Sequence, residues 1–405
     1  MKVVTRFSRA LFAVIAGLAC LGAVACTPLS RGDAVPATLE AQTVMPGMPG
    51  VRFWGDEATP EMMQTGRQAY EWEKAYLAST GYTALTLPPA NFLAISGGGE
   101  NGAFGAGVLC GWTKTGTRPE FKIVTGVSTG ALTAPFAFLG SAYDDKLREI
   151  YTTLSAKDVL TSNGMIASIL FEDAFADNAP LRATVAKYFD QKMLEAVGAE
   201  YKKGRVLLVG TTDLDARRPV IWDIGRIAIS GNPGALTLVQ RILVASAAIP
   251  GAFPPTMIDV EANGKKYQEM HVDGGATSQV FVYPPSLNVS TSGIVRERHL
   301  YVIRNARLDP NWAQVSRSTF SIAGKAIDSL IQTQGVGDLF RIYATSQRDH
   351  VDFNLAYIPK TFTRELKEPF ETAYMNELFQ VGYDLGVKGY PWEKAPPGLE
   401  ALSPP

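Results

Sequence analysis

The sequence is poor in residues that bind metals or form disulfides. Among its 405 residues there are only three cysteines and three histidines: Cys20, Cys26, Cys110, His271, His299 and His350. So few ligands disfavour a structural zinc site, which needs a full set of cysteine or histidine side chains. Only Cys26 and Cys110 would survive removal of an N-terminal signal, and if Cys26 carries a lipid, Cys110 has no partner and no disulfide framework exists. We expect Cys110, which lies in an apolar helical pattern, to be a small buried core residue.

The sequence also lacks an excess of charge of either sign. Its formal net charge is −1, and it has no run of Lys and Arg that could follow a phosphate backbone. This argues against a nucleic-acid partner. Hydrophobic residues make up 46% of the chain and charged residues 19%. That composition is typical of a globular protein, and the length suffices for one large α/β domain.

Residues 1–26 have the pattern of an export signal. Three basic residues, Lys2, Arg6 and Arg9, precede a stretch without charge from Ala10 to Ala25. A membrane-spanning helix needs about 20 apolar residues, so this shorter stretch is more typical of the apolar part of a signal peptide. A short anchor helix that is never removed is the alternative.

The signal segment ends in Ala23-Val24-Ala25-Cys26, which resembles the lipobox of bacterial lipoproteins. The resemblance implies that Cys26 becomes the first residue and carries a lipid. We therefore expect an exported, membrane-associated protein that faces the periplasm or the cell exterior. Because Thr27 rather than an aspartate follows Cys26, we expect the outer membrane. Cleavage near Ala25 without lipidation is the alternative.

The composition changes at both ends of the remaining chain. Residues 27–51 are rich in Pro, Ala, Gly and Thr, which predicts a flexible tether. Residues 391–405 are again rich in Pro, and we expect a tail there. No linker or internal repeat divides the sequence between them, so residues 52–390 are predicted to form one catalytic domain.

Strand-like and helical patterns alternate through this domain, which predicts an α/β fold. The predicted strands are Asn91–Ser96, Phe121–Val127, Arg205–Thr211, Arg218–Asp223, Tyr267–Asp273, His299–Arg304 and Val351–Ile358. The predicted helices are Gly102–Thr115, Thr129–Leu139, Asp144–Leu154, Leu181–Phe189, Leu236–Ala247 and Glu371–Leu385.

One local motif is typical of a serine nucleophile. Gly126-Val127-Ser128-Thr129-Gly130 joins a predicted strand to a predicted helix. A nucleophile elbow needs glycines on both sides of its serine, because the tight turn leaves no room for side chains. The serine then lies at a helix N-terminus, which favours negative charge. Alternatively, Ser128 is an ordinary helix N-cap.

A glycine-rich loop directly follows the first predicted strand. Gly97, Gly98 and Gly99 stand between Ser96 and Glu100. Consecutive glycines let backbone amides approach an anion, as an oxyanion hole requires. A phosphate-binding loop is disfavoured because the Lys-Ser/Thr ending of a P-loop is missing. A structural glycine turn is the other alternative.

A third motif, Asp273-Gly274-Gly275, stands at the end of a predicted strand. Such a turn would leave the aspartate carboxylate accessible at the strand end. An Asp-Gly pair is also common in turns that have no other role, so this motif alone does not indicate a function.

Together the three motifs resemble the patatin-like phospholipase family, in which a glycine-rich oxyanion loop, a G-x-S-x-G elbow and a D-G-G/A motif follow in this order. Ala245 to Pro250, followed by Phe253-Pro254-Pro255, also resembles the family segment that precedes the aspartate. The resemblance extends from about Phe92 to Gly275. Family members commonly carry Arg or Lys two residues after the glycines, where this chain has Asn101.

The resemblance implies a three-layer fold with a mainly parallel central sheet and helices on both faces. It implies that Ser128 attacks an acyl carbonyl, that Asp273 accepts its proton, and that the amides of Gly97, Gly98 and Gly99 hold the oxyanion. It implies a phospholipid or related lipid ester as substrate and requires no metal or other cofactor. The apolar stretches 164–171 and 253–255 could line an acyl pocket or belong to the core.

Two alternatives to this function stay open. His350 could complete a Ser–Asp–His triad of the α/β-hydrolase kind in an esterase for small acyl esters. The chain could also be a catalytically silent lipoprotein that binds lipid or a partner on a hydrolase scaffold. His271 shares a strand face with Asp273, so it would support that residue or only pack.

A carboxylate base has a consequence for the pH dependence of the rate. An ordinary aspartate has a pKa near ~4, so we expect no inflection in the histidine range unless the carboxylate is strongly desolvated. An inflection near pH ~6.5 that depends on His350 would favour the triad instead.

Overall fold

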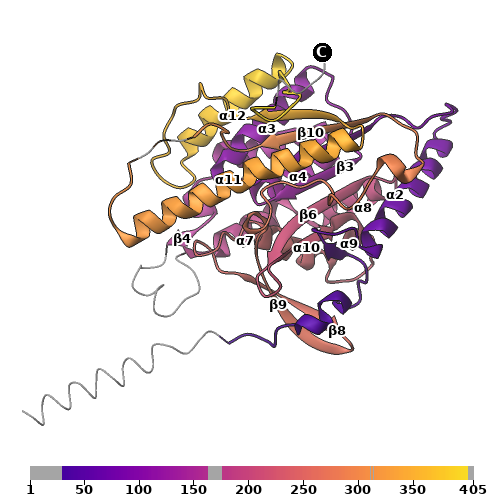
Figure 1. Ribbon diagram of the computed structural model, residues 1–405, viewed down its shortest axis with the longest axis horizontal. Helices are drawn as coiled ribbons and strands as arrows, with labels where there is room; N and C mark the ends of the chain where they lie inside the picture. Colours follow the sequence, from indigo (N-terminus) through magenta and orange to yellow (C-terminus); the bar gives the residue numbers. More distant parts are fainter. Residues whose placement is uncertain (1–29, 163–175, 311, 313, 400–405) are drawn as a thin grey trace, which may run out of the picture.

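The structure is a computed structural model that describes residues 30–162, 176–310, 312 and 314–399 (Figure 1). The predicted signal peptide and Cys26 lie outside these residues, as does the stretch 164–171. Within the described ranges, no helix has both the length and the apolar character needed to cross a bilayer.

A nine-stranded mixed sheet forms the centre of the fold. Its main path runs β1-β7-β6-β3-β2-β10-β11, and β9 pairs with both β6 and β8. The strands from β11 to β6 are parallel, whereas β1, β7, β8 and β9 pair antiparallel with their neighbours. The bounds are β1 Arg52–Trp54, β2 Ala90–Ile95, β3 Ile123–Val127, β6 Val206–Asp213, β7 Arg218–Asp223, β8 Thr256–Ala262, β9 Lys265–Asp273, β10 Arg298–Arg304 and β11 Asp352–Tyr357. A separate small sheet pairs β4 (Thr161–Ser162) with β5 (Ala176–Asp177).

Helices of different lengths surround this sheet. Figure 1 shows the long helix α11 lying across it, with α3 and α12 side by side. The α-helices are α2 Pro60–Ser79, α3 Gly102–Lys114, α4 Thr129–Leu139, α5 Asp144–Thr153, α7 Ala179–Tyr188, α8 Gln191–Tyr201, α9 Ile224–Ala228, α10 Ala235–Ser246, α11 Thr319–Arg348 and α12 Thr372–Val387. Short 3-10 helices are η1 Ala37–Gln42, η2 Gly99–Asn101, η3 Ser141–Tyr143, η4 Ala156–Asp158, η5 Gly274–Ala276 and η6 Ser290–Ser292.

Alternate side chains of β2 belong to two different hydrophobic cores, and this shows how the helices and the sheet are layered. On β2, Leu93 and Ile95 belong to the core that contains the buried residues of α3, α4 and α10. Phe92 and Ala94 belong to a second core beneath α11. Successive side chains of a strand point to opposite faces, so helices cover both faces of the sheet. The predicted three-layer α/β fold is confirmed.

The sequence predicted the central elements closely but missed others. The missed strands and α-helices are β1, β4, β5, β8, α2, α8, α9 and α11. In α2 only Thr65, Ala69 and Glu73 are buried, and none of the three is a large apolar residue. The usual apolar period is therefore weak.

Strand β8 had a signal that the prediction did not use. A two-residue Asn263-Gly264 loop joins β8 to β9, and both residues have positive φ, 48° and 72°. That pair is typical of a type I′ hairpin turn.

Residues 27–51 were predicted to form a flexible tether, and the structure corrects this for the described part, residues 30–51. Met45 and Met48 are buried in the main core, and Val44 forms an antiparallel bridge with Glu261 on β8. The Pro46-Gly47 pair forms a turn closed by a 3.0 Å hydrogen bond from the Met48 amide to the Met45 carbonyl. With Gly47 at φ 69°, this is a type II turn, so the Pro-Gly pair shapes an ordered segment.

The predicted tail is also ordered at its start. Trp392 packs against Trp112, Tyr301 and Tyr390, and Glu393 forms an antiparallel bridge with Leu355 on β11. Aromatic contacts therefore outweigh the Pro-rich composition up to this point. Cys110, as predicted, is buried.

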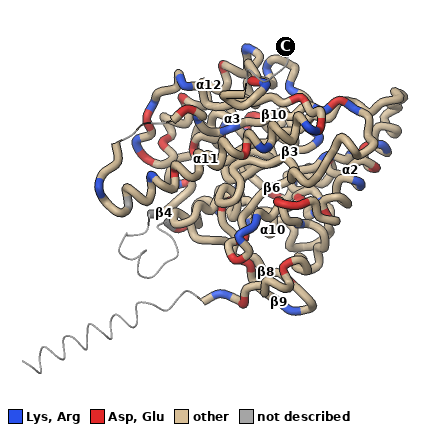
Figure 2. The backbone as a smooth tube through the Cα atoms, in the orientation of Figure 1, with Lys and Arg blue, Asp and Glu red and all other residues tan. Residues whose placement is uncertain are grey.

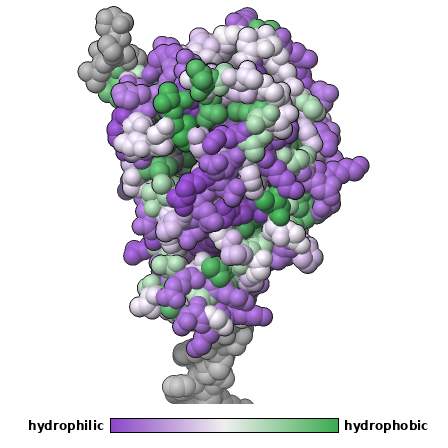
Figure 3. All heavy atoms as spheres, turned by 90° about the vertical axis from the view of Figure 1, so that its right-hand side faces the viewer, coloured by the Kyte–Doolittle hydropathy of each residue, from purple (hydrophilic) through white to green (hydrophobic). Residues whose placement is uncertain are grey.

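Charges of both signs are interspersed along the chain (Figure 2). On the side that carries α2, hydrophobic residues form patches separated by hydrophilic ones (Figure 3).

We expect Met45→Ala to lower the free energy of unfolding by roughly 2–3 kcal/mol, because it leaves a cavity in the core. Val44→Ala is the matched control, since the Val44 side chain is 41% exposed and Met45 only 7%. Urea unfolding followed by circular dichroism measures both. Equal, small effects of the two changes would show that this segment contributes nothing to the core.

Candidate active site

Ser128 lies at the turn between β3 and α4 in an unusual backbone conformation. Its φ and ψ are 56° and −128°, a combination that costs a residue with a side chain on the order of 1–3 kcal/mol. The Ser128 amide donates a 2.9 Å hydrogen bond to the Ser246 hydroxyl, which in turn donates to the Gly210 carbonyl at 2.7 Å. The strained turn is thus tied to α10 and β6.

The two glycines of the motif are required by close backbone contacts. A Cβ atom on Gly126 would lie 2.4 Å from the Gly130 carbonyl oxygen, and one on Gly130 would lie 2.2 Å from the Ile95 carbonyl oxygen. Ile95 ends β2, so the second contact brings the elbow against the start of the glycine-rich loop. The interpretation of this motif as a strand–elbow–helix turn is therefore correct.

The glycine-rich loop lies beside Ser128, but its three amides are not equivalent. The Gly97 amide donates to the Gln279 carbonyl at 3.0 Å, so it is already engaged. Gly98 and Gly99 have φ of 156° and 56°, and within the described residues their amides donate to no protein acceptor. Only these two amides of the predicted oxyanion set are therefore available to a ligand.

Asp273 ends β9 opposite Thr211 of β6, and its carboxylate faces Ser128. The carboxylate accepts a 2.7 Å hydrogen bond from the Gly275 amide. Burial raises the pKa of Asp273 to about 6, although hydrogen bonds with the Ser128 hydroxyl and the Gly275 amide act in the opposite direction. The Asp273 amide donates to the Ala248 carbonyl at 2.9 Å. The segment 245–250 singled out in the sequence therefore holds this aspartate in place.

The geometry contradicts the Ser–Asp–His alternative. Ser128 follows Gly126, which pairs with Ile95 at the carboxyl ends of the parallel strands. His350 precedes Asp352, which pairs with His299 at the amino ends of β11 and β10. The two ends of the sheet are a strand length apart, and a strand rises about 3.3 Å per residue. His299 and His350 therefore lie at the opposite end of the sheet from Ser128.

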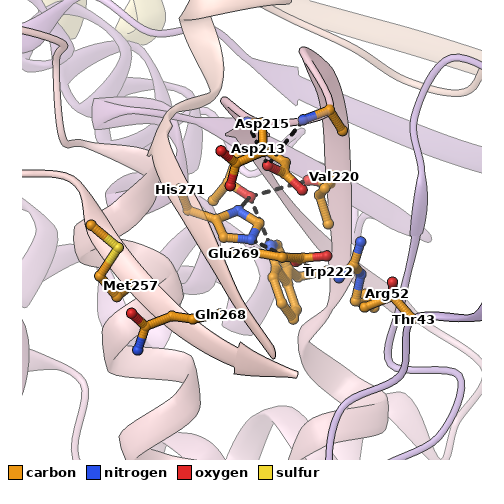
Figure 4. Close-up of polar contacts among 12 residues, drawn as sticks. Thr43, Arg52, Asp213, Asp215, Val220, Trp222, Met257, Gln268, Glu269 and His271 are labelled. Atoms are coloured by element: carbon orange, nitrogen blue, oxygen red, sulfur yellow. Dashed lines mark hydrogen bonds and ion pairs between the residues drawn. The ribbon is translucent and has the colours of Figure 1, made fainter. Parts of the chain in front are cut away.

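The third histidine belongs to a buried polar network. His271 Nε2 lies 3.0 Å from Glu269 Oε2 and its Nδ1 lies 3.0 Å from the Thr211 hydroxyl. Arg52 contacts Glu269 at 2.5 Å, and Figure 4 shows these three charged or titratable side chains pointing toward one another. Burial alone would raise the pKa of Glu269, but Arg52 and His271 lower it to about 2. His271 thus supports the strand that ends in Asp273, without contacting Ser128.

An apolar pocket with an empty volume of about 880 Å³, its open mouth included, begins at Ser128. Gly99 and Glu100 lie at the same site, and the walls are mainly apolar, for example Leu132, Phe136 and Phe253. Burial raises the pKa of Glu100. The predicted stretch 253–255 therefore contributes Phe253 to this pocket.

Three residues that support the site were not found from the sequence. They are Gln279, Arg304 and Asn305, which contact the glycine-rich loop. Ser246 lies in the segment 245–250 that the sequence singled out, but its hydrogen bond to the elbow was not predicted. Asn305 donates from its amide side chain to the Ser96 carbonyl at 2.9 Å. No local pattern marks these residues, because their partners lie far away in the sequence. The alternation of strands was one available signal, since it places residues 304 and 305 at the carboxyl end of a parallel strand.

Comparisons with known proteins agree with the motifs. Residues 93–285, which include all three motifs, match the sequence model of a family described as patatin-like phospholipase. The match spans 193 of 405 residues. No curated protein matches the chain.

Several solved structures are similar at low sequence identity. VipD from Legionella pneumophila has 14% identity and a TM-score of 0.36, covering 75% of this chain and 67% of that one. Human GIVD cytosolic phospholipase A2 has 11% identity and a TM-score of 0.32, covering 70% of this chain and 54% of that one. The type III effector protein ExoU has 13% identity and a TM-score of 0.31, covering 75% and 53%. The chain therefore spans about half the length of the latter two.

The raised pKa of Asp273 predicts a pH-dependent effect on stability. The unfolded chain binds this proton with a pKa near ~3.9 and the folded protein with a pKa of about 6. The resulting stabilisation is present below pH ~4 and is lost as the pH rises through about 6. Asp273→Asn cannot ionise, so it should be more stable than wild type at pH 8, by on the order of 3 kcal/mol at most, and not at pH 4.

Urea unfolding at the two pH values measures this difference. Asp328→Asn is the matched control, because Asp328 is exposed and should show no such pH dependence. An Asp273→Asn variant that gains nothing at pH 8 would contradict the strong desolvation of this carboxylate.

Proposed function

We propose that this protein is a serine acyl-ester hydrolase of the patatin-like phospholipase type, which cleaves lipid esters with a Ser128–Asp273 dyad. The observation that carries the proposal is one contact. The hydroxyl of the strained Ser128 meets a fully buried carboxylate at the head of an apolar pocket. The family match over residues 93–285 supports the same reaction class.

The first half of the reaction transfers the acyl group to the serine. As Ser128 Oγ bonds to the acyl carbon, the Asp273 carboxylate accepts the hydroxyl proton and the carbonyl electron pair moves to the oxygen. The free amides of Gly98 and Gly99 stabilise this oxyanion, and the positive end of α4 adds to the effect. The bond to the leaving oxygen then breaks, and Asp273 returns the proton to the departing alcohol.

The second half releases the acid. A water molecule gives its proton to Asp273 as its oxygen bonds to the acyl carbon, and the tetrahedral intermediate forms on the same amides. Collapse breaks the bond to Ser128 Oγ, which regains its proton from Asp273. The sum is one ester and one water converted to a carboxylic acid and an alcohol.

The lining of the pocket favours a long acyl chain over a short soluble one. Its walls are largely hydrocarbon, for example Leu132, Phe136 and Phe253, and such a lining suits an acyl chain better than a polar group. Each buried CH₂ group contributes about 0.8 kcal/mol to binding. We therefore propose phospholipids or related lipid esters as substrates. We further propose export and anchoring through a lipid on Cys26, on the basis of the sequence pattern, which would keep the enzyme beside a membrane.

Ser128→Ala and Asp273→Asn should each abolish hydrolysis of a phospholipid panel, by about a thousandfold or more, because nucleophile and base act as one unit. A fluorophosphonate should label wild type but not Ser128→Ala. Ser246→Ala should lower the activity only in part, because it removes the hydrogen bond that supports the elbow but leaves nucleophile and base in place. Folded wild type that neither labels nor hydrolyses any ester would instead indicate a silent scaffold that binds lipid or a partner.

The pKa of about 6 for Asp273 changes the expected pH profile. The sequence predicted no inflection in this range, but burial shifts the carboxylate into it. Because the base must be ionised, kcat/KM for a soluble ester should be constant above pH ~7 and fall about tenfold per pH unit below ~6. The inflection should persist in His299→Asn and His350→Asn. Its disappearance in either variant would contradict Asp273 as the base.

A further inference from the structure

Arg304 is a buried cation beside the glycine-rich loop. It ends β10 next to β2, and only 3% of its surface is exposed. Its Nη1 donates to the Gly97 carbonyl at 3.4 Å and to Gln279 Oε1 at 3.5 Å, both long hydrogen bonds. Its Nε has no hydrogen-bond partner within the described part of the chain. Burying a charge with so few partners is costly, which calls for a compensating role.

The Arg304 guanidinium remains a cation at neutral pH. Burial lowers its pKa to about 10, against the opposing effect of Asp338. Asp338 on α11 is occupied elsewhere, because it accepts from the Gln279 amide at 2.6 Å and pairs with Arg341. Close packing holds the guanidinium in place, since a Cβ atom on Gly335 of α11 would lie 2.4 Å from Nη2. Its hydrogen bonds are made to the glycine-rich loop and to Gln279.

Arg304 contacts the carbonyl end of the peptide group that joins Gly97 to Gly98. The carbonyl of Gly97 and the amide N–H of Gly98 belong to the same planar unit. The carbonyl oxygen accepts from both Arg304 and the Ser96 hydroxyl, the latter at 2.7 Å. Donors at the oxygen polarise the unit and strengthen its N–H as a donor, because hydrogen bonds in a chain reinforce one another. That N–H is one of the two free amides beside Ser128.

The same peptide is restrained from its other side. A Cβ atom on Gly98 would lie 2.2 Å from the Asn305 carbonyl oxygen, and the Asn305 amide donates to the Ser96 hydroxyl at 2.8 Å. The end of β10 thus supplies both the cation and the surface against which the loop lies. The peptide is held with its oxygen toward Arg304.

We propose that Arg304 is a positioning residue of the oxyanion site, which orients and polarises the Gly97–Gly98 peptide so that the Gly98 N–H stabilises the tetrahedral intermediate. This inference rests on the proposed hydrolase function. Arg304 does not touch the substrate, and its effect passes through the peptide. Removing one oxyanion donor outright costs about 10²- to 10³-fold in kcat, so loss of its polarisation should cost less, roughly 10- to 100-fold.

The test compares Arg304→Met with Arg304→Lys on a soluble p-nitrophenyl acyl ester. Arg304→Met should lower kcat by roughly 10- to 100-fold with KM nearly unchanged, because the charge acts on the oxyanion and not on the bound ester. A long-chain trifluoromethyl ketone, which forms an oxyanion adduct with the serine, should bind more weakly by a similar factor. The matching methylene compound without the carbonyl should bind equally to both proteins. Arg304→Lys should recover part of both losses, since it restores a cation.

Arg307→Met is the matched control, because Arg307 lies three residues further along and pairs with Asp309. It should leave kcat and ketone affinity unchanged. Circular dichroism and thermal unfolding show whether each variant folds, and the methylene compound shows whether its pocket is intact.

Two results would overturn the inference. One is a folded Arg304→Met variant with the kcat and ketone affinity of wild type. The other is a fall in kcat without weaker ketone binding, which would indicate a structural role alone. Failure of the proposed function gives a different result, in which wild type itself neither hydrolyses the ester nor reacts with a fluorophosphonate.

Discussion

The left-handed backbone conformation of Ser128 is held by contacts with α10 and β2, which lie far from it in the sequence. Ser246 on α10 accepts the hydrogen bond of its amide, and the two glycines of the motif let α4 and β2 approach without side chains. The cost of the strained turn, on the order of 1–3 kcal/mol, is offset by these contacts. The turn directs the hydroxyl toward the end of β9, where the Asp273 carboxylate lies. The remaining geometry of the site follows from this constraint.

The sheet topology explains why the three motifs meet. Parallel strands β2 and β3 end side by side, so the loops after them lie at one edge, as is usual for ligand sites of α/β folds. Strand β9 runs antiparallel to β6 and reaches the same edge from the opposite direction. An aspartate at its end therefore faces a serine that lies about 145 positions earlier in the chain.

Two buried charge arrangements flank the site and differ in kind. On the β9 side, Arg52 and Glu269 form a buried ion pair and His271 contacts Glu269, which stabilises the strand that carries Asp273. On the β10 side, Arg304 is left with long hydrogen bonds and one unpartnered nitrogen. The first arrangement is internally satisfied, as buried charges usually are. The second directs its charge at a backbone peptide. Between them Asp273 is buried without a cationic partner among the described residues, and burial raises its pKa.

The sequence by itself determined the local structures whose causes are local. Apolar periodicity located the central strands, and glycine spacing located the elbow and the loop, because both depend on residues that are neighbours in the chain. Composition misjudged residues 44–51 and the start of the tail, since Pro-Gly turns and single aromatic residues become ordered only against partners such as Glu261 or Trp112. Only the tertiary structure decided which amides of the glycine-rich loop are free. It also decided that His350 lies at the opposite end of the sheet from Ser128 and that Arg304 contacts the Gly97 carbonyl. Those properties depend on burial and on contacts between residues far apart in the chain, which no local pattern encodes.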